Sequence, residues 1–168
     1  CTRGYRRASS HQWALMGSDA SQRAGQRRDA SIYGHRLVDA RTALTDELKD
    51  SARIAAYLNE FDLLVIPGGV KALEKLRQEK HVTAFITEWN RQGKVIASTC
   101  HGAQLLISAK IVKGRKISGY FSIEDDIENA GASYVNAPFV IDGNIVSSPH
   151  YQWMGEWMKA SINLAKKI

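Results

Sequence analysis

Residues 95–104 place a thiol and an imidazole side by side at the end of an apolar run. Cys100 and His101 follow Val-Ile-Ala-Ser-Thr and precede Gly102. A cysteine thiolate attacks carbonyl carbon, and an adjacent imidazole can take up or return its proton. The small residues Ser98 and Gly102 lie two positions before and after the thiol. A nucleophile elbow needs that spacing because larger side chains would clash across its tight turn. The pattern predicts covalent catalysis by Cys100.

The surroundings of this elbow are expected to activate the thiol. A predicted helix over 103–109 begins just after Cys100, so N–H groups at its start would lower the thiol pKa. The backbone N–H of His101 would point at a developing oxyanion, and the Gly68-Gly69 loop would offer a second donor. We therefore expect an ionised sulfur at neutral pH, in a crevice lined by main-chain donors.

Strands and helices are predicted to alternate around these residues. Apolar periodicity and turn residues predict helices over 51–58, 72–92, 103–109, 123–130 and 153–167. They predict strands over 61–66, 94–99 and 116–118, and a hairpin over 134–147 that turns at Asp142-Gly143-Asn144. Such alternation implies an α/β fold with parallel strands joined by right-handed crossovers. Ligands bind beyond the carboxyl ends of such strands, where Gly68-Gly69 and Cys100 both fall.

Length and composition predict one domain over residues 1–168. No apolar stretch approaches the roughly 18 to 20 residues of a membrane span, and no secretory signal is visible, so we expect a cytoplasmic protein without a membrane partner. Two cysteines, Cys1 and Cys100, are too few for a disulfide framework. The histidines show no paired metal-ligand spacing, so we expect neither a metal nor another cofactor.

The net charge of +6 is concentrated at the start of the chain. Residues 1–30 carry six arginines against two aspartates, whereas the rest of the sequence is close to neutral. No zinc-finger, RNP-like or helix-turn-helix signature accompanies the charge. We therefore expect a solvated basic face and no nucleic-acid partner.

Four segments closely resemble the ThiJ/PfpI superfamily, especially its PfpI-type intracellular proteases. They are residues 64–69, 97–106, 113–116 and 125–132. The segments occur in the family's order, and the match runs from about 62 to 148. The resemblance implies a flavodoxin-like three-layer sandwich with a mostly parallel sheet, related to class I glutamine amidotransferases.

The resemblance also implies roles for individual residues. Cys100 would be the nucleophile with His101 beside it, and Tyr120 matches a family tyrosine close to the nucleophile. In PfpI-type oligomers a Glu after the Gly-Gly loop reaches the Cys-His pair of a neighbouring subunit, and Glu74 stands at the corresponding place. The resemblance therefore implies a homo-oligomer, a dimer or hexamer, with a site completed across an interface.

The first 30 residues depart from the family pattern. Family members open with an apolar strand and then a loop whose Glu hydrogen-bonds the nucleophilic Cys. Here the first Glu is Glu47, and the apolar cluster at 13–16 is too short to assign. A divergent front end and a shifted reading frame are both open explanations. Residues 33–39 fit the later part of the family's N-terminal half, and Ala103 replaces the family's usual Pro.

A second departure lies near the C-terminus. Residues 148–151, Ser-Pro-His-Tyr, replace a segment that often carries Arg in the family. Contacts with the substrate cannot be carried over there, and we expect His150 to be a surface loop residue.

The leading hypothesis is a PfpI-like cysteine hydrolase, an intracellular peptidase. One alternative implied by the same family is a cofactor-independent glyoxalase or protein deglycase, whose thiolate adds to a small aldehyde to form a hemithioacetal. Another is non-catalytic: a stress-related chaperone or redox sensor in which Cys100 is oxidised to a sulfinate. The expected partner is a peptide or a small carbonyl compound.

Overall fold

The computed structural model describes residues 13–15, 31–32, 35–39 and 51–167. Its main sheet has seven strands in the order β2-β3-β1-β4-β5-β9-β8. These strands are β1 (Trp13–Leu15), β2 (Ser31–Ile32), β3 (His35–Asp39), β4 (Leu63–Ile66), β5 (Val95–Thr99), β8 (Val140–Asp142) and β9 (Ile145–Ser148). The inner strands pair in parallel, whereas β2 and β8 are antiparallel edge strands. The predicted mostly parallel sheet is confirmed.

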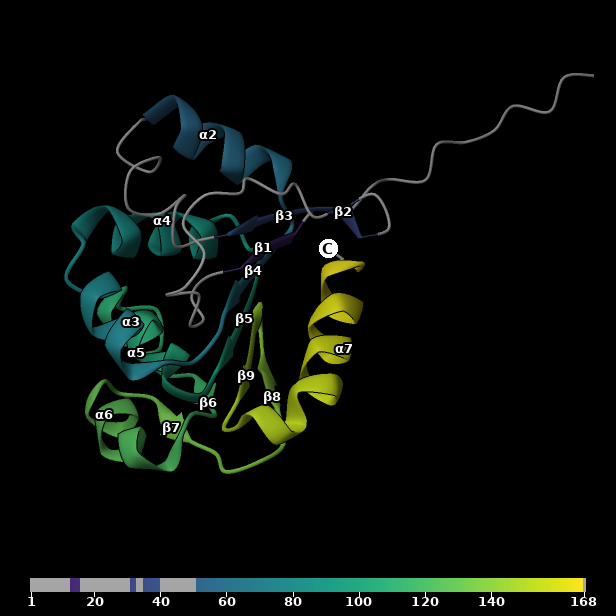
Figure 1. Cartoon of the computed structure of the whole chain (residues 1–168). Coiled ribbons are helices and arrows are strands. Elements are labelled where there is room, and N and C mark those ends of the chain that lie inside the picture. Colours follow the sequence, from purple (N-terminus) through teal and green to yellow (C-terminus); the bar gives the residue numbers. More distant parts are fainter. Residues whose placement is uncertain (1–12, 16–30, 33–34, 40–50, 168) are drawn as a thin grey trace, which may run out of the picture.

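Helices cover both faces of this sheet (Figure 1). One face carries α2 (Ser51–Glu60), α3 (Val70–Leu76), α4 (Lys80–Arg91) and α5 (Ala103–Ser108), and the other carries α7 (Met154–Ala165). Side chains alternate along β4, as the pleat of a strand requires. Leu64 and Ile66 enter the core under α3, α4 and α5, whereas Leu63 and Val65 enter the core under α7. The three-layer sandwich therefore follows from an apolar strand buried on both sides.

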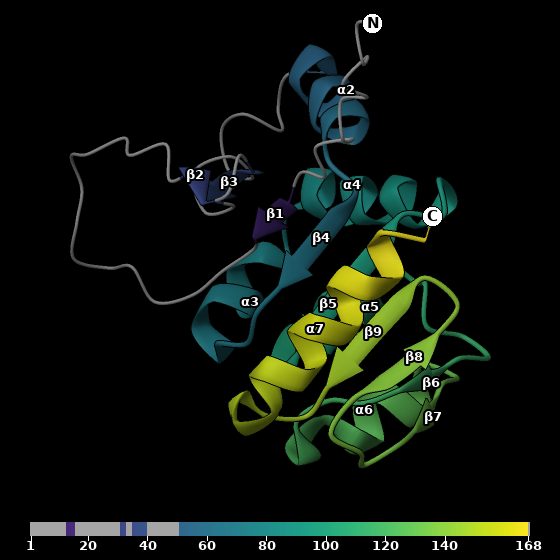
Figure 2. The same cartoon turned by 90° about the vertical axis from the view of Figure 1, so that its right-hand side faces the viewer.

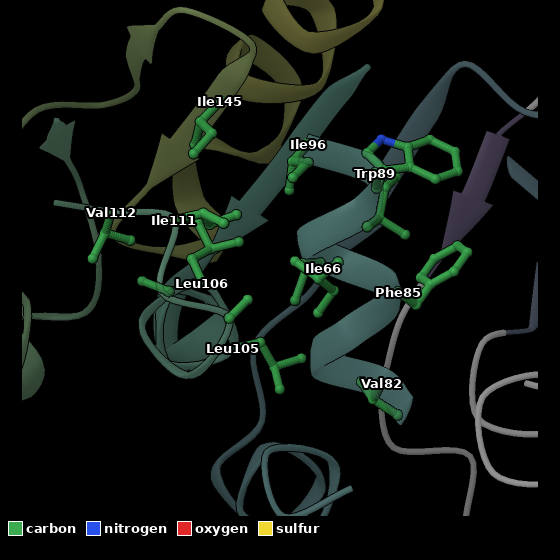
Figure 3. Close-up of a cluster of buried hydrophobic side chains, with 14 of the residues drawn as sticks. Ile66, Val82, Phe85, Trp89, Ile96, Leu105, Leu106, Ile111, Val112 and Ile145 are labelled. Atoms are coloured by element: carbon green, nitrogen blue, oxygen red, sulfur yellow. The ribbon is translucent and has the colours of Figure 1, made fainter. Parts of the chain in front are cut away.

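A buried tryptophan anchors a helix to the sheet on each face. Figure 3 shows Trp89 of α4 packed among the aliphatic side chains of the larger core. Its indole N–H donates to the carbonyl of Val95 at 3.0 Å, and the indole of Trp157 in α7 donates to Val146 at 3.0 Å. Burying such a side chain stabilises the fold by about 1.5–3 kcal/mol. These contacts fix β5 and β9, the strands that lead to the candidate site.

The single helix predicted over 72–92 is wrong, because two helices occupy that range. α3 ends at Leu76 and α4 begins at Lys80. At the break, the N–H groups of Gln78 and Glu79 bond only three residues back, and Glu79 turns to an extended conformation. No core residue lies between Leu76 and Val82 in the sequence, so apolar burial does not hold one continuous helix together there.

The predicted hairpin over 134–147 begins too early, because Tyr134 belongs to a small second sheet. The hairpin is formed by β8 and β9, and Gly143 supplies the positive φ of its turn, +57°. Tyr134 instead lies in β7 (Ser133–Tyr134), which pairs in parallel with β6 (Lys116–Ile117). The helix α6 (Glu124–Asn129) lies between them in the chain, and Figure 2 shows this unit beside β8. The predicted elements at 116–118 and 123–130 are confirmed with shorter bounds.

The unassigned apolar cluster at 13–16 contributes a strand to the middle of the sheet. Trp13–Leu15 forms β1 and pairs in parallel with both β3 and β4. A run of three strand residues is too short for periodicity to reveal. The rest of residues 1–30, which depart from the family pattern, lies outside the described residues. Within the described ranges, no helix is long and apolar enough to cross a membrane.

Candidate active site

Two loops meet at the carboxyl ends of β4 and β5. The strands are parallel neighbours with Ile66 opposite Ser98, so the segments that follow them emerge side by side. Gly68 shows how closely the two segments approach. A Cβ added to this glycine would lie 2.7 Å from the Cβ of Cys100 and 3.2 Å from its Sγ. The expected convergence of the Gly-Gly loop and the thiol is confirmed, and Gly68 is the residue that permits it.

The backbone at Cys100 has the tight turn that the spacing predicted. Cys100 begins the short 3-10 turn η2 (Cys100–Gly102) with φ of +57°, a left-handed conformation that side chains rarely adopt. Such a conformation costs on the order of 1–3 kcal/mol and is found at functional sites. Behind the turn, a Cβ on Gly102 would lie 2.6 Å from the carbonyl oxygen of Ile66. The sulfur therefore lies on a strained turn. Close packing of Gly102 against Ile66 prevents this turn from moving toward β4.

The imidazole of His101 lies between the thiol of Cys100 and the hydroxyl of Ser122. Its Nδ1 lies 3.3 Å from Cys100 Sγ, and its Nε2 lies 3.4 Å from the Oγ of Ser122. Ser122 belongs to the 3-10 turn η3 (Phe121–Ile123). When Ser122 donates to Nε2, Nδ1 carries the ring proton; when Ser122 accepts, Nδ1 is free to take the thiol proton. Sequence reasoning missed Ser122, whose one signal was its position beside Tyr120.

Burial sets the protonation of both groups. Half-burial raises the pKa of the Cys100 thiol above its ordinary value, and a hydrogen bond from the backbone N–H of His101 lowers it by less. Burial also lowers the pKa of the His101 imidazole. Both shifts favour a neutral thiol beside a neutral imidazole at neutral pH. They oppose the lowered thiol pKa that the sequence predicts, because desolvation of the half-buried sulfur outweighs the donor of the His101 backbone; the ionised sulfur stays a prediction.

A row of aromatic rings, the aromatic wall, begins at the ring of His101. The backbone N–H of Tyr120 donates to the carbonyl of Cys100 at 3.2 Å, and its ring lies 5.0 Å from the ring of His101. The rings continue from Tyr120 to Phe121 at 4.3 Å and to His150 at 6.2 Å, and from His150 to Tyr151 at 3.9 Å. Phe121 and Tyr151 form an exposed rim. The expected place of Tyr120 near the nucleophile agrees with this geometry.

His150 lies in the loop after β9, as the sequence suggested, but its partly buried ring also belongs to the aromatic wall. The reason is topological: β9 pairs with β5 so that Ser148 lies opposite Thr99. The residues after each strand must therefore reach the same crevice. Only the pairing of the two strands, which the sequence does not state, could have placed His150 here.

Two other predicted residues, Gly69 and Glu74, lie in the segment after β4. Gly69 is exposed and precedes α3 with φ of +118°, a conformation open to glycine. Glu74 lies on α3 with its side chain exposed, and its backbone carbonyl accepts a bond from Gln78. Its reach to a neighbouring subunit stays a prediction, as do the catalytic roles of Cys100 and His101. In the part of the chain that the structure covers, no group of three or more His, Cys, Asp or Glu side chains could hold a metal ion.

Comparisons with known proteins match a large part of the chain. The model of the DJ-1/PfpI family matches residues 35–164. The chain is 47% identical over 105 residues to the deglycase TK1284 of Thermococcus kodakarensis, which covers 60% of this chain and 63% of that protein. It is 44% identical over 105 residues to the deglycase PfpI of Pyrococcus furiosus, with the same shares covered. The chain therefore spans less than two thirds of the length of these relatives.

A solved structure gives the same assignment of fold. It is a two-domain protein of Anabaena variabilis that contains dj-1/thij/pfpi-like and ferritin-like domains. It superposes with a TM-score of 0.61 at 36% sequence identity and covers 63% of this chain and 31% of that one. The predicted flavodoxin-like sandwich is confirmed by this likeness.

Proposed function

The chain belongs to the DJ-1/PfpI family, and on that premise we propose that it is a cysteine-dependent deglycase acting on small aldehydes and their adducts. Two of its relatives are named deglycases, which favours the aldehyde alternative over the peptidase hypothesis. The observation that carries the proposal is the Cys100 thiol on a left-handed bend, 3.3 Å from the imidazole of His101.

The first step uses the neutral pair as it stands. Cys100 Sγ attacks the aldehyde carbon of a 2-oxoaldehyde while its proton passes to Nδ1 of His101. The electrons of the C=O bond move to oxygen, which then takes a proton and completes a hemithioacetal. The backbone N–H of His101, already directed at the sulfur, can donate to this oxygen as charge develops.

The remaining steps need no external oxidant. A base removes the C–H proton of the hemithioacetal, and a proton returns to the neighbouring keto carbon. The former aldehyde carbon is thereby oxidised to a thioester and the keto carbon is reduced to an alcohol. Water then hydrolyses the thioester to a 2-hydroxy acid and restores the thiol. Among the described residues, His101 is the base in contact with the sulfur, and Ser122 holds its far nitrogen.

The test measures lactate formed from methylglyoxal beside hydrolysis of a peptide substrate. We expect lactate formation by the native chain and a loss of at least about 100-fold in Cys100→Ala, since positioned nucleophiles and bases contribute on that scale. The matched control is Cys1→Ala, which removes the other cysteine and should retain turnover. Peptide hydrolysis that depends on Cys100 without lactate formation would support the peptidase instead. Absence of thiol-dependent turnover in both assays would contradict both enzymes.

A further inference from the structure

A groove between α4 and the segment after α5 is lined by positive charge. It has a volume of about 700 Å³, and the cations along it are Lys80 and Arg91 of α4 and Lys110, Lys113 and Arg115 of the following segment. No carboxylate is among the described residues that line it. The groove shares no residue with the Cys100 site, and α4 and α5 lie on the face of the sheet opposite α7 (Figure 1).

Most of these charges are not neutralised within the described ranges. Arg91 pairs with Glu88 at 2.7 Å. The other four cations make no ion pair with a carboxylate that the structure places. An anion bound in the groove would be attracted by all four charges at once.

Arg115 is held in place by neutral hydrogen-bond acceptors, so no carboxylate among them neutralises its positive charge. Its guanidinium donates to the backbone carbonyl of Asp142 at 3.1 Å and to the side-chain oxygens of Asn144 and Asn90 at 3.2 and 3.3 Å. All three acceptors are neutral. The carboxylate of Asp142 is engaged elsewhere and accepts the N–H of Lys116 at 2.8 Å. The side chain is therefore ordered before any ligand arrives, which lowers the entropic cost of binding an anion.

Lys110 adds a second unusual feature. Its φ is +58°, at the end of α5, where glycine is the common residue. A lysine in this conformation costs roughly 1–2 kcal/mol, yet here it contributes a charge to the groove. Glycine at this position would avoid the strain, so this positive charge comes with a cost in stability.

The lining indicates the class of ligand. Between the cations lie small and polar residues such as Thr83, Ala84 and Ser108, with no aromatic side chain. Bases of a single strand would have nothing to stack on. A row of phosphates needs only cations and polar groups. α4 spans twelve residues, which at about 1.5 Å per residue gives roughly 16 Å between its ends, enough for several phosphates.

We propose that this groove binds the phosphate backbone of double-stranded nucleic acid without regard to sequence. The proposal reverses the expectation of no nucleic-acid partner, which rested on charge along the sequence. Acidic residues such as Glu88 and Asp126 interrupt the basic ones in the sequence. Folding places Asp126 on α6, outside the groove, whereas Glu88 pairs with Arg91 and leaves the other four cations without a carboxylate partner among the described residues.

The test is fluorescence anisotropy of a labelled duplex of about 20 base pairs, titrated with the full chain at 50 to 200 mM NaCl. With four counterions released, the slope of log K against log salt should be about −3.6, so affinity should fall about 150-fold across that range. The triple variant Lys80→Gln/Lys110→Gln/Lys113→Gln keeps only Arg115 of the four unpaired groove cations. Its slope of log K against log salt should therefore be only about −0.9. The corresponding Lys→Arg triple variant should bind like the native chain.

The matched control changes the same charge on the other face. Lys159, Lys166 and Lys167 lie in or directly after α7, and their triple Gln variant should keep native affinity and slope. Equal weakening in both triple variants, no binding of duplex at 50 mM salt, or tighter binding of a single strand would each overturn the proposal. Thermal unfolding verifies that each variant is folded. If a triple variant does not fold, the three single Lys→Gln variants are measured in its place. Lactate formation in the groove variants should be unchanged, so failure here is separable from failure of the proposed enzyme.

Discussion

Replacing Gly68 by alanine should disable the thiol through direct contact. The new Cβ would lie 2.7 Å from the Cβ of Cys100, whereas carbon atoms pack at about 3.5–4.0 Å. About 1 Å must therefore be absorbed by the Gly68 loop or by the elbow. The elbow has little freedom, because Gly102 is packed against the carbonyl of Ile66 on its other side. A displacement of about 1 Å can lower turnover about 100-fold, and overpacking should lower the free energy of unfolding by about 1–3 kcal/mol.

Gly69→Ala is the matched control for this change. Its Cβ would meet no atom within 4 Å, but its φ of +118° is one that alanine rarely adopts. This variant should lose about 1–3 kcal/mol of stability through backbone strain, while turnover per folded molecule stays within a few-fold of native. The assays are lactate formation, alkylation of Cys100 followed by mass spectrometry, and urea unfolding. The pair separates contact with the nucleophile from strain in the loop.

Two results would refute this reasoning. If Gly68→Ala is folded and reacts at the native rate in both turnover and alkylation, then Gly68 does not lie against Cys100. If both variants lose turnover to the same extent, then strain in the loop, rather than contact with the sulfur, controls the site.

Three further predictions concern protonation, positioning and strain. Alkylation of Cys100 by iodoacetamide should rise with pH through a midpoint above the ordinary thiol pKa of about 8.5, because burial raises its pKa; a rate already at its plateau at pH 7 would contradict this. Ser122→Ala should lower turnover about fivefold and alter its pH profile, since one hydrogen bond contributes about 1 kcal/mol, whereas Ser122→Thr should retain native behaviour; an unchanged profile in the alanine variant would remove Ser122 as a positioning residue. Lys110→Gly should raise the free energy of unfolding by about 1 kcal/mol by relieving a φ of +58°, and a loss of stability in urea unfolding would show that the lysine side chain contributes more than the strain costs.

Features encoded by neighbouring residues could be predicted from the sequence. The apolar run before Cys100 and the glycine after it predict a strand and a tight turn, and the structure has both. Gly143 likewise predicts the turn of the hairpin. Each of these depends on a few consecutive side chains, whose conformational preferences act locally.

Features that depend on which strands pair could not be predicted in this way. His150 and Ser122 reach Tyr120 and His101 from distant segments. His150 does so because β9 lies beside β5, and Ser122 because the N–H of Tyr120 is bonded to the carbonyl of Cys100. A long-range pairing leaves no periodic trace in either segment. The aromatic wall therefore could not be predicted, although Cys100 could be singled out from its neighbours in the sequence.

The protonation of Cys100 bears on the choice between the two candidate reactions. Sequence reasoning weighed the start of a helix, which lowers a thiol pKa, but could not weigh burial, which raises it and is the larger effect here. A neutral thiol with a neutral imidazole can add to an aldehyde, since attack and proton transfer occur together and no leaving group must be expelled. An amide is a poorer electrophile, and its amine must also be protonated to leave. The raised thiol pKa is therefore a further argument for the proposed aldehyde substrates over peptides.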